Sequence, residues 1–291
     1  MSVYFHNWWP GFFSRTDANN ITFFKKLMLH TTTLHTCVDN IEQADVLLEA
    51  GKPNDNIIKN WTFKINFIGE PVLPDHEKYD LVLTSINTIN NVVDLPVSVM
   101  YILGNDMFSR LHNRKLANII PTEFCCFIVS NSKCEARNKM FRLLNQYKKV
   151  NSGGSYCNNI GGKLAGTWSS DNHLKFIARH KFMICFENTA METYSTEKIV
   201  NAYLAGVIPI YWSSGHITNI FNPESMLFLN DLSDDSYNEL LAKIIELDQN
   251  DDKYLEFVNR PVFNAHNLKY WNMHYTFTAL AQKIDNVLLK S

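Results

Sequence analysis

Polar residues gather in one stretch of this 291-residue chain, between an apolar strand and a helix opened by Ser195 or Thr196. The stretch contains the amide of Asn188, and the first turn of the helix carries Glu197 and Lys198. In open α/β sheets, the carboxyl end of a parallel strand that leads into a helix N-terminus is where anions and nucleotides bind. The stretch is therefore a candidate nucleotide site. The alternative is an ordinary helix cap with solvated first-turn charges.

Lys198 favours the binding interpretation on electrostatic grounds. The N-terminus of a helix is already the positive end of its dipole, so a cation in the first turn is unfavourable for the helix itself. A residue that binds a ligand can occupy a position that is unfavourable for the helix, so Lys198 is interpreted as a ligand-binding residue.

Glycines in the middle of the chain resemble a phosphate-binding loop only in part. Gly162-Lys163 looks like the tail of G-x-x-x-x-G-K-[ST], but Cys157 occupies the first glycine position and Leu164 the Ser/Thr position. No G-x-G-x-x-G occurs. A P-loop NTPase or a classical dinucleotide enzyme is therefore disfavoured. The glycines are interpreted as turn residues that could also let the backbone approach a ligand.

No metal site is indicated. The six cysteines include no C-x-x-C pair, and the cluster His30, His35 and Cys37 matches no standard ligand spacing, so ordinary packing is the better interpretation. The chain has no Asp-x-Asp motif of the kind that holds a divalent cation on a sugar nucleotide. Scattered cysteines in a chain of this length are typical of a reducing cytosol.

The elements that must position these residues follow an α/β pattern. In the first part of the chain, short apolar, β-rich runs alternate with helical patterns, which predicts a parallel sheet. They are Val3–Phe5, Phe23–His30, Val46–Glu49, Phe63–Ile68, Leu81–Thr84 and Val97–Ile102.

A second series of the same kind begins after a polar interval between Gly104 and Glu123, where we expect a domain junction. Two such series predict two Rossmann-like lobes facing a cleft. The last apolar pattern, Tyr270–Leu289, predicts a helical segment that packs back across the first lobe. The second series comprises Phe124–Ser130, Cys134–Gln146, Lys148–Val150, Asp171–Arg179, Phe182–Phe186, Ser195–Ala205, Val207–Tyr211, Asn222–Leu229 and Asp234–Leu247.

Composition excludes several classes of protein. The chain is 46% hydrophobic and 19% charged, which is typical of a soluble globular protein rather than a disordered one. Its net charge of −2 gives no global basic field for nucleic acid, so none is expected as a partner. No signal peptide or membrane anchor is indicated, and a cytoplasmic location is expected.

Four stretches together resemble the signatures of the α1,3/4-fucosyltransferases, glycosyltransferase family 10. The first is the polar stretch with the strand after it, which matches F-E-N-x-x-x-x-x-Y-x-T-E-K without a gap. The others are Asn7-Trp8-Trp9-Pro10, Phe67-Ile68-Gly69-Glu70-Pro71 and the segment Phe127–Asn158, and Asn222-Pro223-Glu224-Ser225 also matches. They span most of the chain, in order.

The resemblance implies a GT-B fold and transfer of L-fucose from GDP-fucose to a glycan hydroxyl, with inversion at the anomeric carbon. It implies an acceptor-binding lobe over residues 1–120, a GDP-fucose-binding lobe over 121–268 and a C-terminal helix, 269–291, that crosses back. The acceptor is expected to be an N-acetylglucosamine or glucose-type residue joined through an α1,3 linkage. No cofactor and no divalent metal are expected to be essential.

The resemblance also implies roles for single residues. Inversion in one step needs a base for the acceptor proton and positive charge on the departing diphosphate. Glu70 is the expected base, although Pro71 stands where family enzymes have Asn. Arg137 and Lys198 are expected to hold the diphosphate, the alternative for Arg137 being a helix-surface residue.

Other side chains are expected to contact donor hydroxyls or the base, or to meet sugar faces. Asn188, Tyr194 and Glu197 match donor-contacting positions of the family. Trp8, Trp9 and Trp212 could stack on sugars, although aromatic residues beside strands are more often part of a core.

Two other functions stay open on the sequence. One is a transferase of the same fold that uses another sugar nucleotide, and the other is an inactive relative that binds glycans. The presence of Glu70, Arg137 and Lys198 together weighs against the inactive relative.

Overall fold

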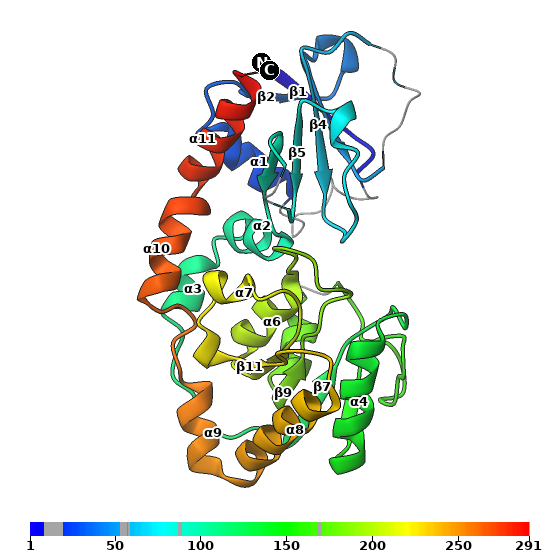
Figure 1. The fold of residues 1–291 in the computed structure, drawn as a ribbon, viewed down its shortest axis with the longest axis vertical. Coiled ribbons are helices and arrows are strands. Elements are labelled where there is room, and N and C mark those ends of the chain that lie inside the picture. The colour runs from blue at the N-terminus through cyan, green and yellow to red at the C-terminus, as the bar shows by residue number, and fades with distance from the viewer. Residues whose placement is uncertain (9–19, 53–56, 58, 87–88, 168–169, 291) are drawn as a thin grey trace. The chain divides into compact units, whose positions relative to one another are not determined.

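The computed structural model describes residues 1–8, 20–52, 57, 59–86, 89–167 and 170–290. These residues form two compact units. Unit 1 consists of Met1–Phe108, Met191–Tyr194 and Leu268–Ser291, and unit 2 of Ser109–Ala190 and Ser195–Asn267. Figure 1 shows unit 1 in blue to cyan with red C-terminal helices, and unit 2 in green to orange.

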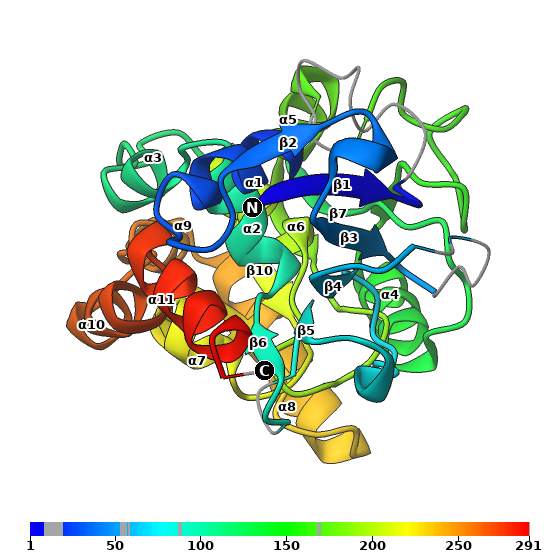
Figure 2. The ribbon, with the colours of Figure 1, turned by 90° about the horizontal axis from the view of Figure 1, so that it is seen from above.

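Unit 1 contains a six-stranded sheet in which every neighbouring pair is parallel, in the order β2-β1-β3-β4-β5-β6. Figure 2 shows these strands side by side in that order. Strands buried on both faces read as continuous apolar runs, which is why β3 and β5 are recognisable in the sequence. The strands are β1 (Ser2–His6), β2 (Thr36–Val38), β3 (Val46–Ala50), β4 (Phe63–Ile68), β5 (Leu81–Thr84) and β6 (Val92–Asp94).

Helices of unit 1 come from both ends of the chain. Helix α1 (Asn20–Met28) contacts α2 (Val97–Gly104) and α11 (Phe277–Leu288), and α11 also contacts β5 and β6. The Asp285 carboxylate on α11 accepts hydrogen bonds from the backbone N–H and the hydroxyl of both Thr32 and Thr33, at 2.6 to 3.2 Å. The prediction that the C-terminal segment packs back on the first lobe is therefore confirmed.

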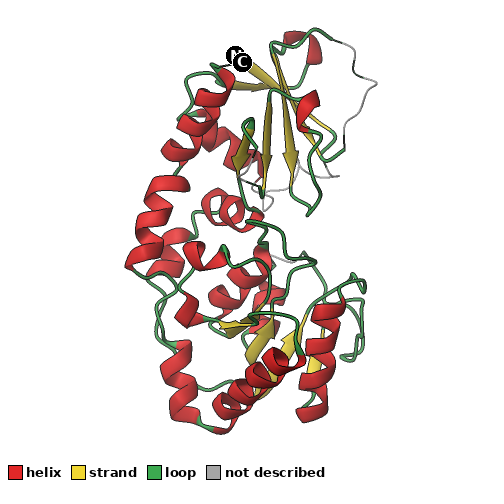
Figure 3. Ribbon diagram, viewed as in Figure 1, coloured by secondary structure: helices red, strands yellow, loops and turns green. Residues whose placement is uncertain are grey.

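Unit 2 contains a five-stranded parallel sheet in the order β11-β10-β9-β7-β8. Figure 3 shows its strands with the helices beside them. The expected alternation of strands and helices is present, so two parallel-sheet α/β lobes are confirmed. The strands are β7 (Glu123–Phe127), β8 (Val150–Ser152), β9 (His180–Ile184), β10 (Ile208–Tyr211) and β11 (Leu227–Phe228).

The remaining helices lie in unit 2 or carry the junctions between units. Helix α3 (Phe108–His112) and helix α10 (Ala265–His274) each contain a boundary between units 1 and 2. No helix of the described residues is both long and apolar enough to cross a membrane. The helices within unit 2 are α4 (Glu135–Tyr147), α5 (Asp171–Ile177), α6 (Glu197–Ala205), α7 (Ile217–Ile220), α8 (Asp234–Gln249) and α9 (Asp251–Val258).

Short elements differ from the sequence expectations. The apolar run Val97–Ile102, which the sequence does not assign to a strand or a helix, forms helix α2, and the three-residue strands β2 and β6 were not expected. The sequence boundaries at residues 120 and 268 stay predictions; the compact units divide after Phe108 and after Asn267.

Candidate functional site

The sheet of unit 2 has one place where the strand order reverses, between β7 and β9. Strand β7 is followed by a loop and helix α4, and β9 by a loop and helix α6. In open parallel sheets, ligands bind outside the carboxyl ends of the strands at such a reversal. Both donor-site signatures expected from the sequence lie in these two loops and the helices that follow them.

Arg137 joins the two loops. It lies in the first turn of α4 and is fully buried. One terminal guanidinium nitrogen donates to the Asn131 carbonyl in the β7 loop at 2.6 Å, and the other to Asn188 Oδ1 in the β9 loop at 2.8 Å. Asn188 and Arg137 thus lie together at the reversal of strand order. The role of Arg137 as a diphosphate ligand stays a prediction.

Glu187 is a functional candidate that the sequence interpretation did not single out. It lies three residues after the end of β9 and next to Asn188 in the chain, and its side chain is fully buried. The carboxylate accepts from Thr196 N at 2.7 Å and from Thr196 Oγ1 at 3.0 and 2.9 Å. Thr196 is the N-cap of α6 but makes no side-chain cap of its own, so Glu187 caps the helix from a distant segment.

Lys198 completes this arrangement. Its Nζ donates to Glu187 Oε2 at 2.9 Å and to Thr196 Oγ1 at 2.8 Å, and its side chain is 15% exposed. The buried carboxylate offsets the unfavourable position of the cation at the positive end of the helix. The unfavourable dipole alone is therefore not sufficient reason to assign Lys198 to a ligand. The partly exposed ammonium at the first turn of α6 still fits one.

The other expected donor contacts are spread along the same loop and helix. Tyr194 is buried, and its N–H donates to the Met191 carbonyl at 2.9 Å in a tight turn. Glu197 is half-buried and begins α6. The structure therefore gathers Arg137 and Asn188 in one cluster, while Tyr194 lies in the four residues of this loop that belong to unit 1.

Gly154 is required by a close approach of two backbones. A Cβ at this position would lie 2.0 Å from the Val129 carbonyl oxygen and 2.4 Å from the Val129 nitrogen. Backbone atoms cannot move aside as a flexible side chain does, so only glycine fits. By contrast, Gly161 and Gly162 have positive φ angles of 87° and 149°, which fits the expected turn residues.

Glu70 lies at the carboxyl edge of the sheet of unit 1. It follows β4 by one residue, Gly69, and is exposed. The Val72 N–H donates to the Glu70 carbonyl at 2.8 Å, so the chain turns sharply at Pro71. An exposed carboxylate in this position is accessible to a substrate hydroxyl.

Two of the tryptophans considered for sugar stacking pack against protein. The Trp8 ring stacks on Phe67, with ring centroids 5.4 Å apart, and its Nε1 donates to the Leu48 carbonyl at 3.2 Å. Trp212 is half-buried and packs at a tilt against Phe186. Trp9 lies outside the described residues.

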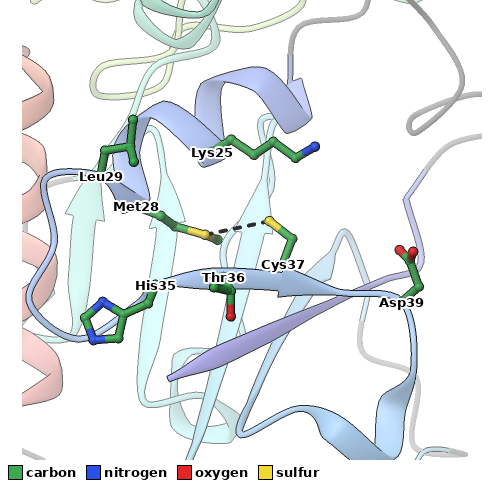
Figure 4. Close-up of a pocket in the computed structure, with 7 residues that line it drawn as sticks. All are labelled: Lys25, Met28, Leu29, His35, Thr36, Cys37 and Asp39. Carbon is green, nitrogen blue, oxygen red and sulfur yellow. Dashed lines mark hydrogen bonds between the residues drawn. The ribbon is translucent and has the colours of Figure 1, made fainter.

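A surface pocket of about 410 Å³ lies elsewhere in unit 1, between α1 and the edge strand β2. Figure 4 shows the Cys37 thiol facing the Met28 sulfur, 3.7 Å away, with the His35 ring pointing away from it. His30 stacks on Phe277 instead. In the part of the chain that the structure describes, no three His, Cys, Asp or Glu side chains are placed to share a metal ion.

Comparison with known proteins identifies related sequences. The family model described as glycosyltransferase family 10 (fucosyltransferase) C-term matches residues 121–288. An α-(1,3)-fucosyltransferase of Helicobacter pylori is 30% identical over 166 residues, which cover 57% of this chain and 33% of that protein. A putative fucosyltransferase of Acanthamoeba polyphaga mimivirus is 26% identical over 224 residues, covering 70% of this chain and 37% of the relative. The chain thus spans little more than a third of the length of these relatives.

Solved structures show the same fold. A crystal structure of an α1,3-fucosyltransferase with GDP-fucose superposes with a TM-score of 0.75 at 22% identity, covering 99% of this chain and 90% of the other. A crystal structure of an α1,3-fucosyltransferase with GDP gives a TM-score of 0.75 at 21% identity, with the same coverage. The two parallel-sheet lobes are therefore of the GT-B type.

Proposed function

Because this chain belongs to glycosyltransferase family 10, the fucosyltransferase family, we propose that it is an inverting glycosyltransferase that moves L-fucose from GDP-fucose to a hydroxyl of a glycan acceptor. The proposed acceptor site is position 3 of an N-acetylglucosamine or glucose-type residue, which gives an α1,3 linkage. The names of the similar enzymes support this choice of donor and linkage.

One observation supports the proposal most strongly. The family match over residues 121–288 includes most of unit 2, and two signature residues, Arg137 and Asn188, meet at the reversal of strand order in its sheet. Arg137 and Asn188 contact each other there, and Lys198 stands in the first turn of the helix that follows. An anion is expected at such a place for reasons of fold and electrostatics alone.

In the proposed mechanism, unit 2 stabilises the leaving group. When the bond between fucose and the diphosphate breaks, negative charge grows on the departing GDP. The Lys198 ammonium and the N-terminus of α6 would face that charge, and Arg137 would contribute if the β9 loop rearranges around the donor. Asn188, Tyr194 and Glu197 would contact hydroxyl groups or the base of the donor.

Glu70 would serve the acceptor. Its carboxylate would take the proton from the acceptor hydroxyl as the oxygen attacks the anomeric carbon on the face opposite to the diphosphate. Residues 1–120 would bind the acceptor and residues 121–268 GDP-fucose. The proposed location is a reducing cytosol, which suits six free cysteines of which four are buried.

Donor identity is tested by turnover with GDP-fucose, GDP-mannose and UDP-sugars under the same conditions. We expect hydrolysis or transfer with GDP-fucose at a rate at least about tenfold above the others, since a polar pocket rejects an unmatched hydroxyl pattern. If only another sugar nucleotide is turned over, that nucleotide and not GDP-fucose is the donor. Glycan binding without turnover of any donor would instead identify an inactive relative.

Metal dependence gives an independent test, because the sequence offers no Asp-x-Asp motif and the proposed diphosphate partners are cations. After exhaustive chelation with EDTA, fucosyl transfer is expected to stay within about threefold of the untreated enzyme, a barrier change below about 1 kcal/mol. Near-complete loss that Mn²⁺ restores would contradict the proposed role of Arg137 and Lys198.

A further inference from the structure

The loop between β9 and α6 changes units twice. Its residues up to Ala190 belong to unit 2, Met191–Tyr194 belong to unit 1, and the chain returns to unit 2 at Ser195. The proposed donor ligands Asn188 and Tyr194 stand on either side of the first change. The contacts of this four-residue segment therefore determine the position of Tyr194.

Thr193 makes the contacts that hold the segment in unit 1. Its hydroxyl donates to Asp94 Oδ1, and its N–H donates to the Ser85 carbonyl at 3.3 Å. Ser85 follows β5, and Asp94 is the last residue of the neighbouring strand β6. Thr193 is 2% exposed and Asp94 7%, so water cannot readily replace either partner.

Asp94 is itself held from the C-terminal end of the chain. The Tyr275 hydroxyl, between α10 and α11, donates to Asp94 Oδ2 at 2.5 Å. Burial raises the pKa of the Asp94 carboxyl to about 6; the hydrogen bonds from Thr193 and Tyr275 and the charge of Lys283 oppose this rise, and Glu192 adds to it. Asp94, Thr193, Tyr275 and Lys283 are called the Asp94 cluster below.

The short distance along the chain links this cluster to the donor site. Tyr194 follows Thr193 directly, and Asn188, which accepts from Arg137, lies five residues before it. Because each residue spans at most about 3.5 Å, a shift of Thr193 by a few ångströms must be taken up by the residues that carry these two side chains.

We propose that Thr193 and Asp94 are positioning residues for Tyr194, one of the proposed donor-contacting residues, through their contact within unit 1. This inference rests on the proposed function. Neither residue touches the donor; together they fix the segment that carries Tyr194. Loss of the Thr193 hydroxyl leaves a buried carboxylate with one hydrogen bond fewer and releases the segment from β6.

The test compares Thr193→Val with Thr193→Ser, measuring the GDP dissociation constant by calorimetry, the KM for GDP-fucose, kcat and thermal unfolding. Thr193→Val keeps the shape but removes the hydroxyl, and we expect about tenfold weaker GDP binding and a similar rise in donor KM. Thr193→Ser keeps a hydroxyl that can donate to Asp94, so its GDP dissociation constant and its KM for GDP-fucose should stay within about twofold of wild type.

Two control variants separate positioning from general packing. Tyr275→Phe removes the other hydrogen bond to Asp94 but leaves Thr193 in place, so it should lower the unfolding temperature with little change in GDP affinity. Ser85→Ala removes a buried hydroxyl that has no hydrogen-bond partner among the described residues, so it should change neither measurement strongly.

The outcomes distinguish this inference from the proposed function. If wild-type protein binds no GDP, the proposed function fails and the inference fails with it. If wild type binds GDP and Thr193→Val binds it equally well, the inference alone is overturned, and the Asp94 cluster is part of the core of unit 1. Equal loss of GDP affinity in Tyr275→Phe and Thr193→Val would also overturn it, because the effect would then follow general damage to unit 1.

Discussion

A Glu70→Gln variant is expected to lose about 10²- to 10⁴-fold in kcat for fucosyl transfer, the usual cost of removing a general base. Glutamine keeps the size of the side chain but cannot accept the acceptor proton at neutral pH. Glu70 belongs to unit 1, whereas the proposed diphosphate partners Arg137 and Lys198 belong to unit 2, so the dissociation constant for GDP should barely change. The two quantities are measured on the same folded preparation.

Glu77→Gln is the matched control for this prediction. Glu77 is another exposed glutamate of unit 1, in the short 3-10 helix His76–Lys78 after the same strand, and should tolerate the change without loss of activity. If Glu70→Gln keeps transfer within about threefold of wild type, less than about 1 kcal/mol of barrier is involved, and another group must take the proton.

A Lys198→Met variant is expected to lose stability and GDP affinity together. Removing the cation leaves the fully buried Glu187 carboxylate without its ion-pair partner. Breaking a buried pair costs about 3 to 5 kcal/mol, and we expect the lower end because Thr196 still donates to the carboxylate. Loss of a charge-assisted contact to diphosphate should also weaken GDP binding by about one to two decades.

A double variant separates these two effects. Glu187→Gln with Lys198→Met has no buried charge to leave unpaired, so chemical denaturation should recover most of the stability while calorimetry still finds weak GDP binding. Lys148→Met is the control, since Lys148 is 49% exposed and Asp248 keeps Lys181 as a partner. Wild-type GDP affinity in the double variant would remove Lys198 from the donor site.

The sequence predicts the long buried strands well because their burial determines their composition. Phe63–Ile68 and Leu81–Thr84 have the predicted limits. Leu81–Thr84 is buried throughout and mostly apolar, as expected of a central parallel strand, whereas in Phe63–Ile68 the apolar residues alternate with Lys64 and Asn66 before Phe67. Val97–Ile102 has the same composition but forms a helix, because periodicity cannot assign so short an apolar run. The edge strands β2 and β6 are only three residues long and leave too weak a pattern.

The sequence names candidate site residues, whose roles stay predictions, but it does not show which contacts they make. The family signature selects Lys198 and Arg137 as candidates. A sequence does not show whether a glutamate such as Glu187 is buried or lies exposed in a loop. Its burial depends on Thr196 and Lys198 folding over it. The pairing of Thr193 with Asp94 spans 99 positions, and no local pattern records such a contact.

The division of the chain also sets an order for folding during synthesis. Apart from the four residues 191–194, unit 1 is built from the beginning and the end of the chain, whereas unit 2 lies between them. The Asp285 carboxylate, which accepts hydrogen bonds from Thr32 and Thr33, is synthesised after all of unit 2. The contacts that α11 makes with α1, β5 and β6 can therefore form only after all of unit 2 has been synthesised.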